Sequence, residues 1–177
     1  ATGAHAVMPM PSSIGCMGLR ERGGLVLALR DGLWLADAHG RLERKVAQAP
    51  YDPGHHRFND GRVDPQGRFW IGTMNERRDA ASAALYRLDA DHAFHRVIDG
   101  ITVSNGLAWS PDRRTMYHAD TPALTVRAYD FDPASGMPSP ISGKRSRRRA
   151  RAARSSAICS CSSGRRGSSS RACAASR

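Results

Sequence analysis

Short runs of strand-forming residues alternate with Gly, Pro, Asp and Asn turns up to about residue 143, and no long pattern with the period of a helix interrupts them. The pattern also repeats. The Asp-Pro-Gln-Gly at 64–67 corresponds to the Ser-Pro-Asp-Arg at 110–113, 46 residues later, and the Leu-Asp-Ala at 88–90 corresponds to the Phe-Asp-Pro at 131–133, 43 residues later. A four-stranded unit that recurs every ~40 to 50 residues is typical of a β-propeller blade. We therefore predict an all-β fold, a partial β-propeller of about three blades over residues 1–143.

The predicted propeller has fewer blades than a closed ring needs. Propellers typically close with about 4 to 8 blades, so about three blades predict a piece of a larger ring. We expect a truncated chain with an unpaired edge strand at each end and an uncovered blade face. The first repeat contains the segment 23–47. Trp34, Trp70 and Trp109 recur at like positions in the three repeats, which predicts blade core and not a platform for stacking bases.

The basic charge of the chain is confined to its C-terminal end. The formal net charge is +11, and residues 144–177 are almost entirely Arg, Ser, Ala, Gly and Cys, with Ile158 the only branched aliphatic residue and no acid. Such a segment has too little apolar surface to offset its ordering entropy, so we predict a disordered tail. Two interpretations remain open: an arginine-rich arm that binds nucleic acid or another polyanion without sequence preference, or an unselected sequence produced by a frameshift in a GC-rich gene.

The cysteines and the apolar runs indicate the compartment. Three of the four cysteines fall in the tail, without a nearby His or acid that would suit a zinc site, and Cys16 stands alone in the body. No disulfide framework is implied, so we expect a reducing, cytoplasmic location. No apolar run approaches the ~20 residues of a membrane helix, so we expect no membrane partner.

Polar residues stand at comparable places in two successive repeats. Arg57, Asn59 and Asp60 are interpreted as loop residues that precede an inner strand, and Ser104-Asn105-Gly106 holds the same place in the next repeat. Amide and carboxylate oxygens suit Ca²⁺ or a similar cation, and an arginine fork suits a carboxylate, a hydroxyl or a developing oxyanion. The alternative is that Asn-Asp-Gly and Ser-Asn-Gly are ordinary turn tripeptides with no further role.

Other candidate sites have less support. No H-E-x-x-H or G-x-S-x-G motif occurs in the chain. His118 and Asp120 would share one face of a strand, and we interpret them as an ordinary blade position and not as a ligand pair. His55 and His56 are predicted to lie in a solvated loop.

Three segments carry a family resemblance: RFNDGRVDPQGRFWIGTM at 57–74, SNGLAWSPDRRTMYHADT at 104–121 and AYDFDPASG at 128–136. Over roughly residues 12–145 the chain resembles the regucalcin (senescence marker protein)/gluconolactonase/luciferin-regenerating-enzyme-like family. The resemblance implies a six-bladed propeller with one catalytic divalent cation in its channel, Ca²⁺ first and Zn²⁺ or Mg²⁺ as alternatives. It also implies metal-assisted hydrolysis of a small-molecule sugar lactone.

The same resemblance assigns residues by position. Asn105 matches the metal-ligand Asn, Arg57 and Asn59 match substrate-contacting residues, and Asp60 with Gly61 would hold the turn. The family's metal-ligand Glu in G-E-G/S-P-x-W and its Asp in P-D-G, which would also serve as general base, have no counterpart in this sequence. We therefore expect weak metal binding and an inactive or weakly active lactone hydrolase, with the catalytic base unassigned. The alternative is a non-enzymatic binding module whose basic tail contacts nucleic acid or another polyanion.

Overall fold

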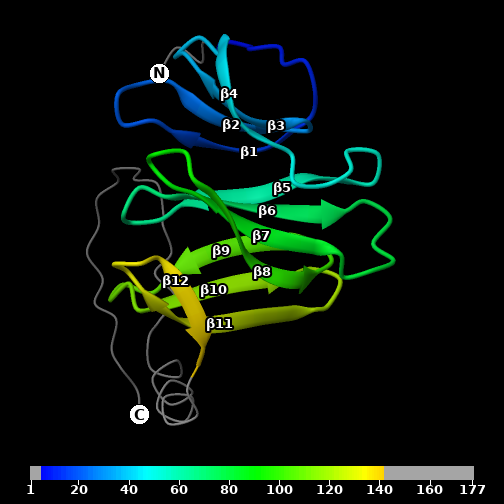
Figure 1. Ribbon diagram of the computed structural model, residues 1–177, viewed down its shortest axis with the longest axis vertical. Coiled ribbons are helices and arrows are strands. Elements are labelled where there is room, and N and C mark those ends of the chain that lie inside the picture. The colour runs from blue at the N-terminus through cyan, green and yellow to red at the C-terminus, as the bar shows by residue number, and fades with distance from the viewer. Residues whose placement is uncertain (1–4, 142–177) are drawn as a thin grey trace, which may run out of the picture. The chain divides into compact units, whose positions relative to one another are not determined.

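The computed structural model describes residues 5–141. Within these residues the chain forms twelve β-strands (Figure 1). The strands are β1 (Ile14–Leu19), β2 (Leu25–Leu29), β3 (Gly32–Ala36), β4 (Leu42–Gln48), β5 (His56–Val63), β6 (Phe69–Asn75), β7 (Ala83–Leu88), β8 (Phe94–Ile101), β9 (Ser104–Trp109), β10 (Thr115–Asp120), β11 (Thr125–Asp132) and β12 (Met137–Pro140). The predicted tail at 144–177 lies outside the described residues.

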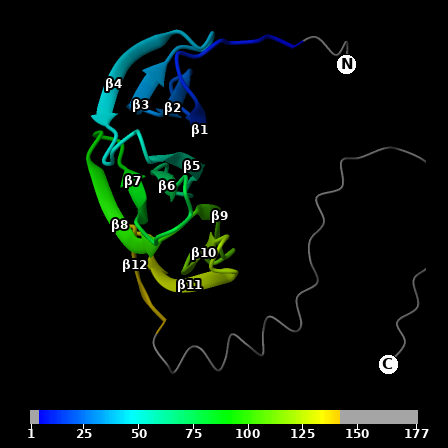
Figure 2. The same cartoon turned by 90° about the vertical axis from the view of Figure 1, so that its right-hand side faces the viewer.

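The strands form three four-stranded antiparallel sheets, each of which follows the chain in the order of its strands. The first strands of the three sheets lie next to one another, with β5 between β1 and β9, and the last strands β4 and β8 lie on the opposite side (Figure 2). Each sheet is one propeller blade, and its first strand is the innermost. The prediction of an all-β propeller with about three blades is therefore confirmed.

The repeat is visible in the turns. The segments 64–67 and 110–113 both connect the first strand of a sheet to the second. The turns that begin at Asp89, directly after β7, and at Asp132, the last residue of β11, correspond in the same way. The first repeat was predicted incompletely, because 23–47 covers only β2 to β4. Its innermost strand, β1, has the sequence IGCMGL and lies upstream.

The tryptophans do not occupy equivalent positions. Trp34 lies on β3, Trp70 on β6 and Trp109 on β9, which are the third, second and first strands of their sheets. The prediction of like positions was wrong, because one large aromatic residue can fill the space between two sheets from any strand that faces it. Trp70 and Trp109 still meet, with ring centroids 6.0 Å apart, in the core between the second and third sheets.

Two apolar cores join neighbouring sheets. The core between the first and second sheets includes Leu33, Phe58 and Ile71, and the core between the second and third includes Trp70, Leu107 and Phe131. The second strand β6 is buried along its whole length and carries mostly apolar or small side chains, because both of its faces are covered.

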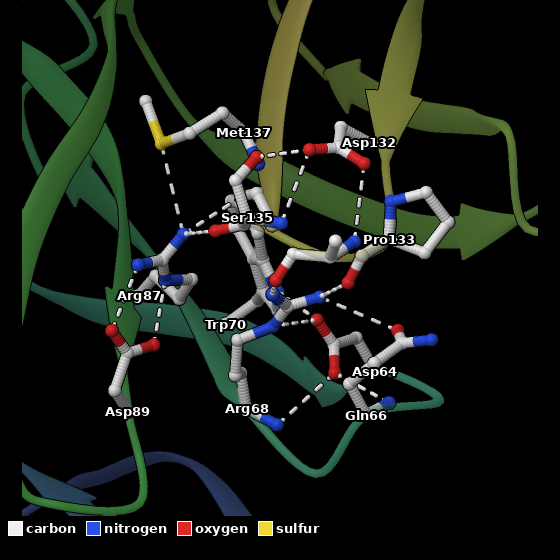
Figure 3. Close-up of polar contacts among 12 residues, drawn as sticks. Asp64, Gln66, Arg68, Trp70, Arg87, Asp89, Asp132, Pro133, Ser135 and Met137 are labelled. Atoms are coloured by element: carbon white, nitrogen blue, oxygen red, sulfur yellow. Dashed lines mark hydrogen bonds and ion pairs between the residues drawn. The ribbon is translucent and has the colours of Figure 1, made fainter.

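A buried carboxylate fixes the turn that joins β5 to β6. The Asp64 side chain accepts the backbone N–H groups of Gln66 and Arg68 at 2.9 and 3.0 Å, the Nε of Arg68 at 2.7 Å and the indole N–H of Trp70 at 3.0 Å (Figure 3). The Arg68 guanidinium then donates to the carbonyl of Pro133 at 3.0 Å. Because Pro133 belongs to the third sheet, this chain of bonds ties the second sheet to the third.

A second arginine makes the same kind of connection from β7. Arg87 is 7% exposed, and its Nε and Nη2 pair with the two oxygens of Asp89 at 2.7 and 2.8 Å. Its Nη1 donates to the carbonyls of Ser135 and Gly136, both at 2.9 Å (Figure 3). A buried guanidinium is stabilised by such a pairing because its donors and its charge are both satisfied.

Candidate functional site

The two Asn-containing tripeptides lie inside strands. Asn59, Asp60 and Gly61 are part of β5, and Asn105 with Gly106 is part of β9, so the interpretation as loops before an inner strand was wrong. Both strands are irregular at these points, since the pairing of each with its neighbour shifts register there. A bulge tolerates turn-forming residues within a strand and re-aims their side chains. The polar residues of the two tripeptides therefore belong to β5 and β9, the innermost strands of their blades.

Glycine is required where the sheets approach most closely. A Cβ on Gly61 would lie 2.5 Å from Sγ of Cys16 on β1, and a Cβ on Gly72 would lie 1.9 Å from Oγ of Ser104 on β9. Without these side chains, β5 can lie close to β1, and β9 can lie close to β6.

The two predicted Asn residues meet directly. Nδ2 of Asn59 donates to Oδ1 of Asn105 at 2.9 Å and to the carbonyl of Ser104 at 2.9 Å. Nδ2 of Asn105 donates in turn to Oγ1 of Thr121 at 2.7 Å. These bonds fix the orientation of both amides, and both side chains are half-buried. Asn59 and Asn105 are 46 residues apart, which is the offset of the repeat.

Asp60 also reaches across to the next blade. Its Oδ2 accepts the N–H of Gly106 at 2.8 Å, and its Oδ1 accepts the N–H of Gly61 at 2.9 Å. The expectation that Asp60 and Gly61 hold a turn was wrong, because this carboxylate instead ties β5 to the bulge of β9. The contact holds in place the backbone next to Asn105.

Between β5 and β9 lies an open groove of about 420 Å³. Its lining residues come from the two innermost strands and are Asp60, Gly61, Arg62, Gly106, Leu107 and Ala108. The groove therefore begins directly beyond the Asn59–Asn105 pair along both strands. Its wall combines one carboxylate and one guanidinium with backbone and apolar surface.

Arg57 stands near the start of β5 and does not contact the Asn pair in the described residues. Its Nη1 donates to the carbonyl of Phe58 at 2.9 Å, and its Nε lies 3.5 Å from Oε1 of Glu76. Glu76 is shared with Arg30, whose Nη1 donates to Oε1 at 3.3 Å and whose Nη2 pairs with Oε2. The hydrogen bond from Arg30 is the main cause that lowers the pKa of Glu76, so this carboxylate is ionised.

Ser104, His118 and Asp120 are three buried polar residues of β9 and β10. Oγ of Ser104 lies 2.8 Å from Nε2 of His118, and the Asp120 carboxylate accepts the N–H groups of Thr102 and Val103, both at 3.1 Å. Burial lowers the pKa of His118 to about 4, so the imidazole is neutral at physiological pH. His118 and Asp120 do share one face, as predicted, and that face is enclosed.

The residues present do not complete a divalent-cation site. Ca²⁺ takes about 6 to 8 oxygen ligands, commonly with several carboxylates, and residues 5–141 contain no group of three His, Cys, Asp or Glu that could hold a metal ion. Oδ1 of Asn105 already accepts one hydrogen bond, and the Asp60 carboxylate accepts two. Asn105 can supply one neutral oxygen ligand, which is too few to hold Ca²⁺ by itself.

Sequence reasoning missed the residues that hold the site in place. Glu76, Arg30 and Thr121 come from different strands or turns and carry no local motif, and only tertiary structure brings them to Arg57 and Asn105. The two histidines of the predicted loop, His55 and His56, lie in different environments. His55 is exposed, with Nε2 3.8 Å from Asp52, whereas His56 begins β5 and lies 2.8 Å from Oγ of Ser82.

Three further expectations concern partners. The described part of the chain contains no helix that is long and apolar enough to cross a membrane. The polyanion-binding tail at 144–177 lies outside the described residues and stays a prediction. The assignments of Arg57, Asn59 and Asn105 to substrate and metal also stay predictions, with the geometry given above.

Three blades, with paired asparagines on the innermost strands of the second and the third, define a β-propeller protein with a polar site at its inner edge. Residues 1–151 match the model of the "SMP-30/Gluconolactonase/LRE-like region". The chain belongs to this family, as the resemblance of its motifs implied.

Individual relatives agree with this membership. The chain is 48% identical over 130 residues to 6-deoxy-6-sulfogluconolactonase of Pseudomonas putida, which covers 73% of this chain and 45% of the relative. It is 42% identical over 125 residues to regucalcin of Danio rerio, which covers 70% and 42%. The crystal structure of the calcium-binding protein regucalcin from Agrobacterium tumefaciens superimposes with a TM-score of 0.68 at 28% identity, over 75% of this chain and 44% of that one. The chain thus spans about half the length of the relatives that it matches.

Proposed function

We propose that this chain is a lactonase-type propeller that binds a sugar lactone at the inner ends of its second and third blades. The observation that carries the proposal is the direct hydrogen bond between Asn59 and Asn105, at 2.9 Å, on the innermost strands of a family member. Relatives named for hydrolysis of gluconolactones support the lactone as the ligand class.

The residues have separate roles in this proposal. Asn59 presents its amide oxygen to the substrate, since its nitrogen is held by Asn105 and Ser104. Arg57 binds sugar hydroxyls or a developing negative charge with its guanidinium. Asn105 would contribute one neutral oxygen to the divalent cation of the family, which would polarise the lactone carbonyl when bound.

The proposed hydrolysis is weak in this chain. A cation held by one neutral amide binds loosely, because affinity rises with the number and charge of the ligands. No residue among those described is placed to act as the general base. We therefore propose binding of the lactone with slow, cation-dependent hydrolysis at best.

Binding and turnover are measured separately. Titration calorimetry with 1,5-anhydroglucitol, a ring analogue that cannot be hydrolysed, should show saturable binding that weakens at least about tenfold in Asn59→Ala, the loss of roughly one good hydrogen bond. Thr125→Ala, at an exposed position of β11, is the matched control and should bind as the unaltered chain does. Hydrolysis of glucono-1,5-lactone, followed by acid release with and without Ca²⁺, reports activity. Equal binding by the unaltered chain and Asn59→Ala would contradict the proposal.

A further inference from the structure

A chain of hydrogen bonds with one fixed direction runs along the inner edge of the second and third blades. It begins at the carbonyl oxygen of Ser104, which can only accept, so the atom of Asn59 that lies 2.9 Å away is Nδ2. The second hydrogen of this Nδ2 goes to Oδ1 of Asn105, also at 2.9 Å. Nδ2 of Asn105 therefore lies on the other side of that amide, where it donates to Oγ1 of Thr121 at 2.7 Å. One backbone carbonyl thus fixes the orientation of both amides and the role of the hydroxyl.

The direction of this chain decides which atoms are left for a ligand. Oδ1 of Asn59 can only accept a hydrogen bond. Oγ1 of Thr121 already accepts one from Asn105, so the hydrogen of the hydroxyl is left to donate. Neither that oxygen nor that hydrogen has a partner among residues 5–141. The site therefore offers an acceptor at Asn59 and a donor at Thr121.

Thr121 is held in place by its backbone and still reaches solvent. It follows Asp120, the last residue of β10, and it is exposed. Its N–H donates to the carbonyl of Val103 at 3.2 Å, and its carbonyl accepts the N–H of Leu124 at 3.1 Å. A donor that is already oriented binds a ligand with less loss of conformational freedom than a mobile one.

A sugar lactone carries a partner for each of these two groups. Its hydroxyls can donate to Oδ1 of Asn59, whereas its carbonyl and ring oxygens can only accept. The hydroxyl of Thr121 needs an acceptor. The carbonyl oxygen suits it best, because this oxygen protrudes from the ring and gains negative charge when water attacks the carbonyl carbon.

The groove lies on the opposite side of the asparagine pair from Thr121. Asp120 pairs with Ser104 at the start of β9, whereas the groove is lined by residues 106–108 further along that strand. A lactone whose carbonyl meets Thr121 would extend its hydroxyls over the asparagines and toward the groove. Asp60 and Arg62, which line the groove, can bind hydroxyls as acceptor and donor.

We infer that Thr121 binds the lactone carbonyl and so fixes which way round the lactone lies in the site. The inference rests on the proposed function, because it assigns a further binding residue to the same site. The contact strengthens as negative charge develops on the carbonyl oxygen, so Thr121 also lowers the barrier to attack by water.

The test compares two ligands that differ at the lactone carbonyl. The full chain is titrated in a calorimeter with glucono-1,5-lactam, which keeps the carbonyl on a six-membered ring and resists hydrolysis. It is also titrated with 1,5-anhydroglucitol, which has a CH₂ group in place of the carbonyl. The lactam should bind about tenfold more tightly, since roughly one good hydrogen bond separates the two.

Substitutions assign this preference to the hydroxyl. Thr121→Val keeps the shape of the side chain, and it should reduce the preference for the lactam to about twofold or less. Its affinity for 1,5-anhydroglucitol should change by less than about twofold, which also shows that the variant is folded. Thr121→Ser keeps the hydroxyl and should keep the preference. Thr125→Val makes the matched change at an exposed residue that pairs with Asp120 on β11, and it should also keep the preference.

Each contrary outcome is distinct. A preference that survives in Thr121→Val overturns the inference: with both affinities unchanged the ring N–H of the lactam causes it, and with both weakened equally Thr121 only positions Asn105. Equal affinity of the unaltered chain for the two ligands overturns the inference and leaves the proposed function standing. Binding of neither ligand contradicts the inference and the proposed function together.

Discussion

His118 is enclosed on the inner face of the third blade, and its environment disfavours the charged imidazole. Burial is the main cause that lowers its pKa to about 4, from an ordinary 6.5, and the charge of Arg127 acts in the same direction. The carboxylates of Asp120 and Asp60 oppose the shift without reversing it. The side chain is 1% exposed, so water does not relieve the penalty.

This shift predicts an acid-sensitive fold. Because the folded state binds a proton more weakly than the unfolded state, the stability linked to His118 is complete above pH ~6.5 and is lost as the pH falls toward ~4. Between pH 7 and pH 5 the free energy of unfolding should fall by about 2 kcal/mol through this residue alone. Urea unfolding followed by tryptophan fluorescence at several pH values measures it.

The control isolates His118 from the other titrating groups. His118→Gln should remove most of the pH dependence in this window, whereas His39→Gln, at an exposed position, should leave it as it is. If the slope of stability against pH were the same in His118→Gln and in the unaltered chain, another group would be responsible.

At the scale of the element, β7 is held to the third blade by more than apolar contact. Arg87 satisfies the carbonyls of Ser135 and Gly136 in the turn before β12 and pairs with Asp89 in the turn that follows its own strand. The guanidinium also lies 6.0 Å from the ring centroid of Trp70, which forms the core beside it. One side chain therefore connects two turns and a core.

Removal of this arginine should weaken the contact between the second and third blades and so destabilise the fold. Arg87→Met keeps the length and apolar stem but removes the donor to the carbonyls of Ser135 and Gly136 and the main partner of Asp89, which His95 still contacts at 3.1 Å. We therefore expect a loss of about 3 kcal/mol in the free energy of unfolding. Arg96→Gln breaks an exposed pair on the neighbouring strand β8 and should cost less than about 1 kcal/mol. Urea titration measures both variants, and an equal, small effect of the two would show that the buried contact adds nothing.

At the scale of the described molecule, three blades leave a sheet face that no fourth blade covers. Tyr117 and Val126 lie on the face of the third blade opposite to His118, and they are 38% and 71% exposed. Ala119 and Ala128, which pair with Val126 and Tyr117, share that face. Exposed apolar surface of this kind favours association.

We therefore expect self-association that increases with concentration, measured by light scattering coupled to gel filtration. The double variant Tyr117→Thr/Val126→Thr keeps strand-forming residues and removes apolar surface, so its apparent mass should rise less steeply. Leu124→Gln changes a residue that is 92% exposed in the turn outside this face, and it should behave as the unaltered chain does. A concentration-independent mass for the unaltered chain would contradict the expectation.

Much of the architecture could be predicted from local pattern. The alternation of strands and turns, the offset between 64–67 and 110–113 and the family motifs led to an all-β propeller of about three blades, and the fold confirms it. The predictions that were wrong also came from local sequence pattern. Asn-Asp-Gly and Ser-Asn-Gly have the composition of turns, so their placement inside β5 and β9 was missed, as was β1, whose sequence IGCMGL has two glycines.

The sequence by itself determined which residues can form strands and turns, because backbone propensity and the repeat depend on neighbours in the chain. Only the tertiary structure decided which side chains meet. Asn59 contacts Asn105 across 46 positions, and Arg30 reaches Glu76 across the same separation. Such pairs depend on how closely two blades approach, and that approach is set by buried side chains and by glycines such as Gly72 that leave room for a neighbour. Hydrogen bonds and ion pairs between blades form only after the cores are packed, so no local pattern reports them.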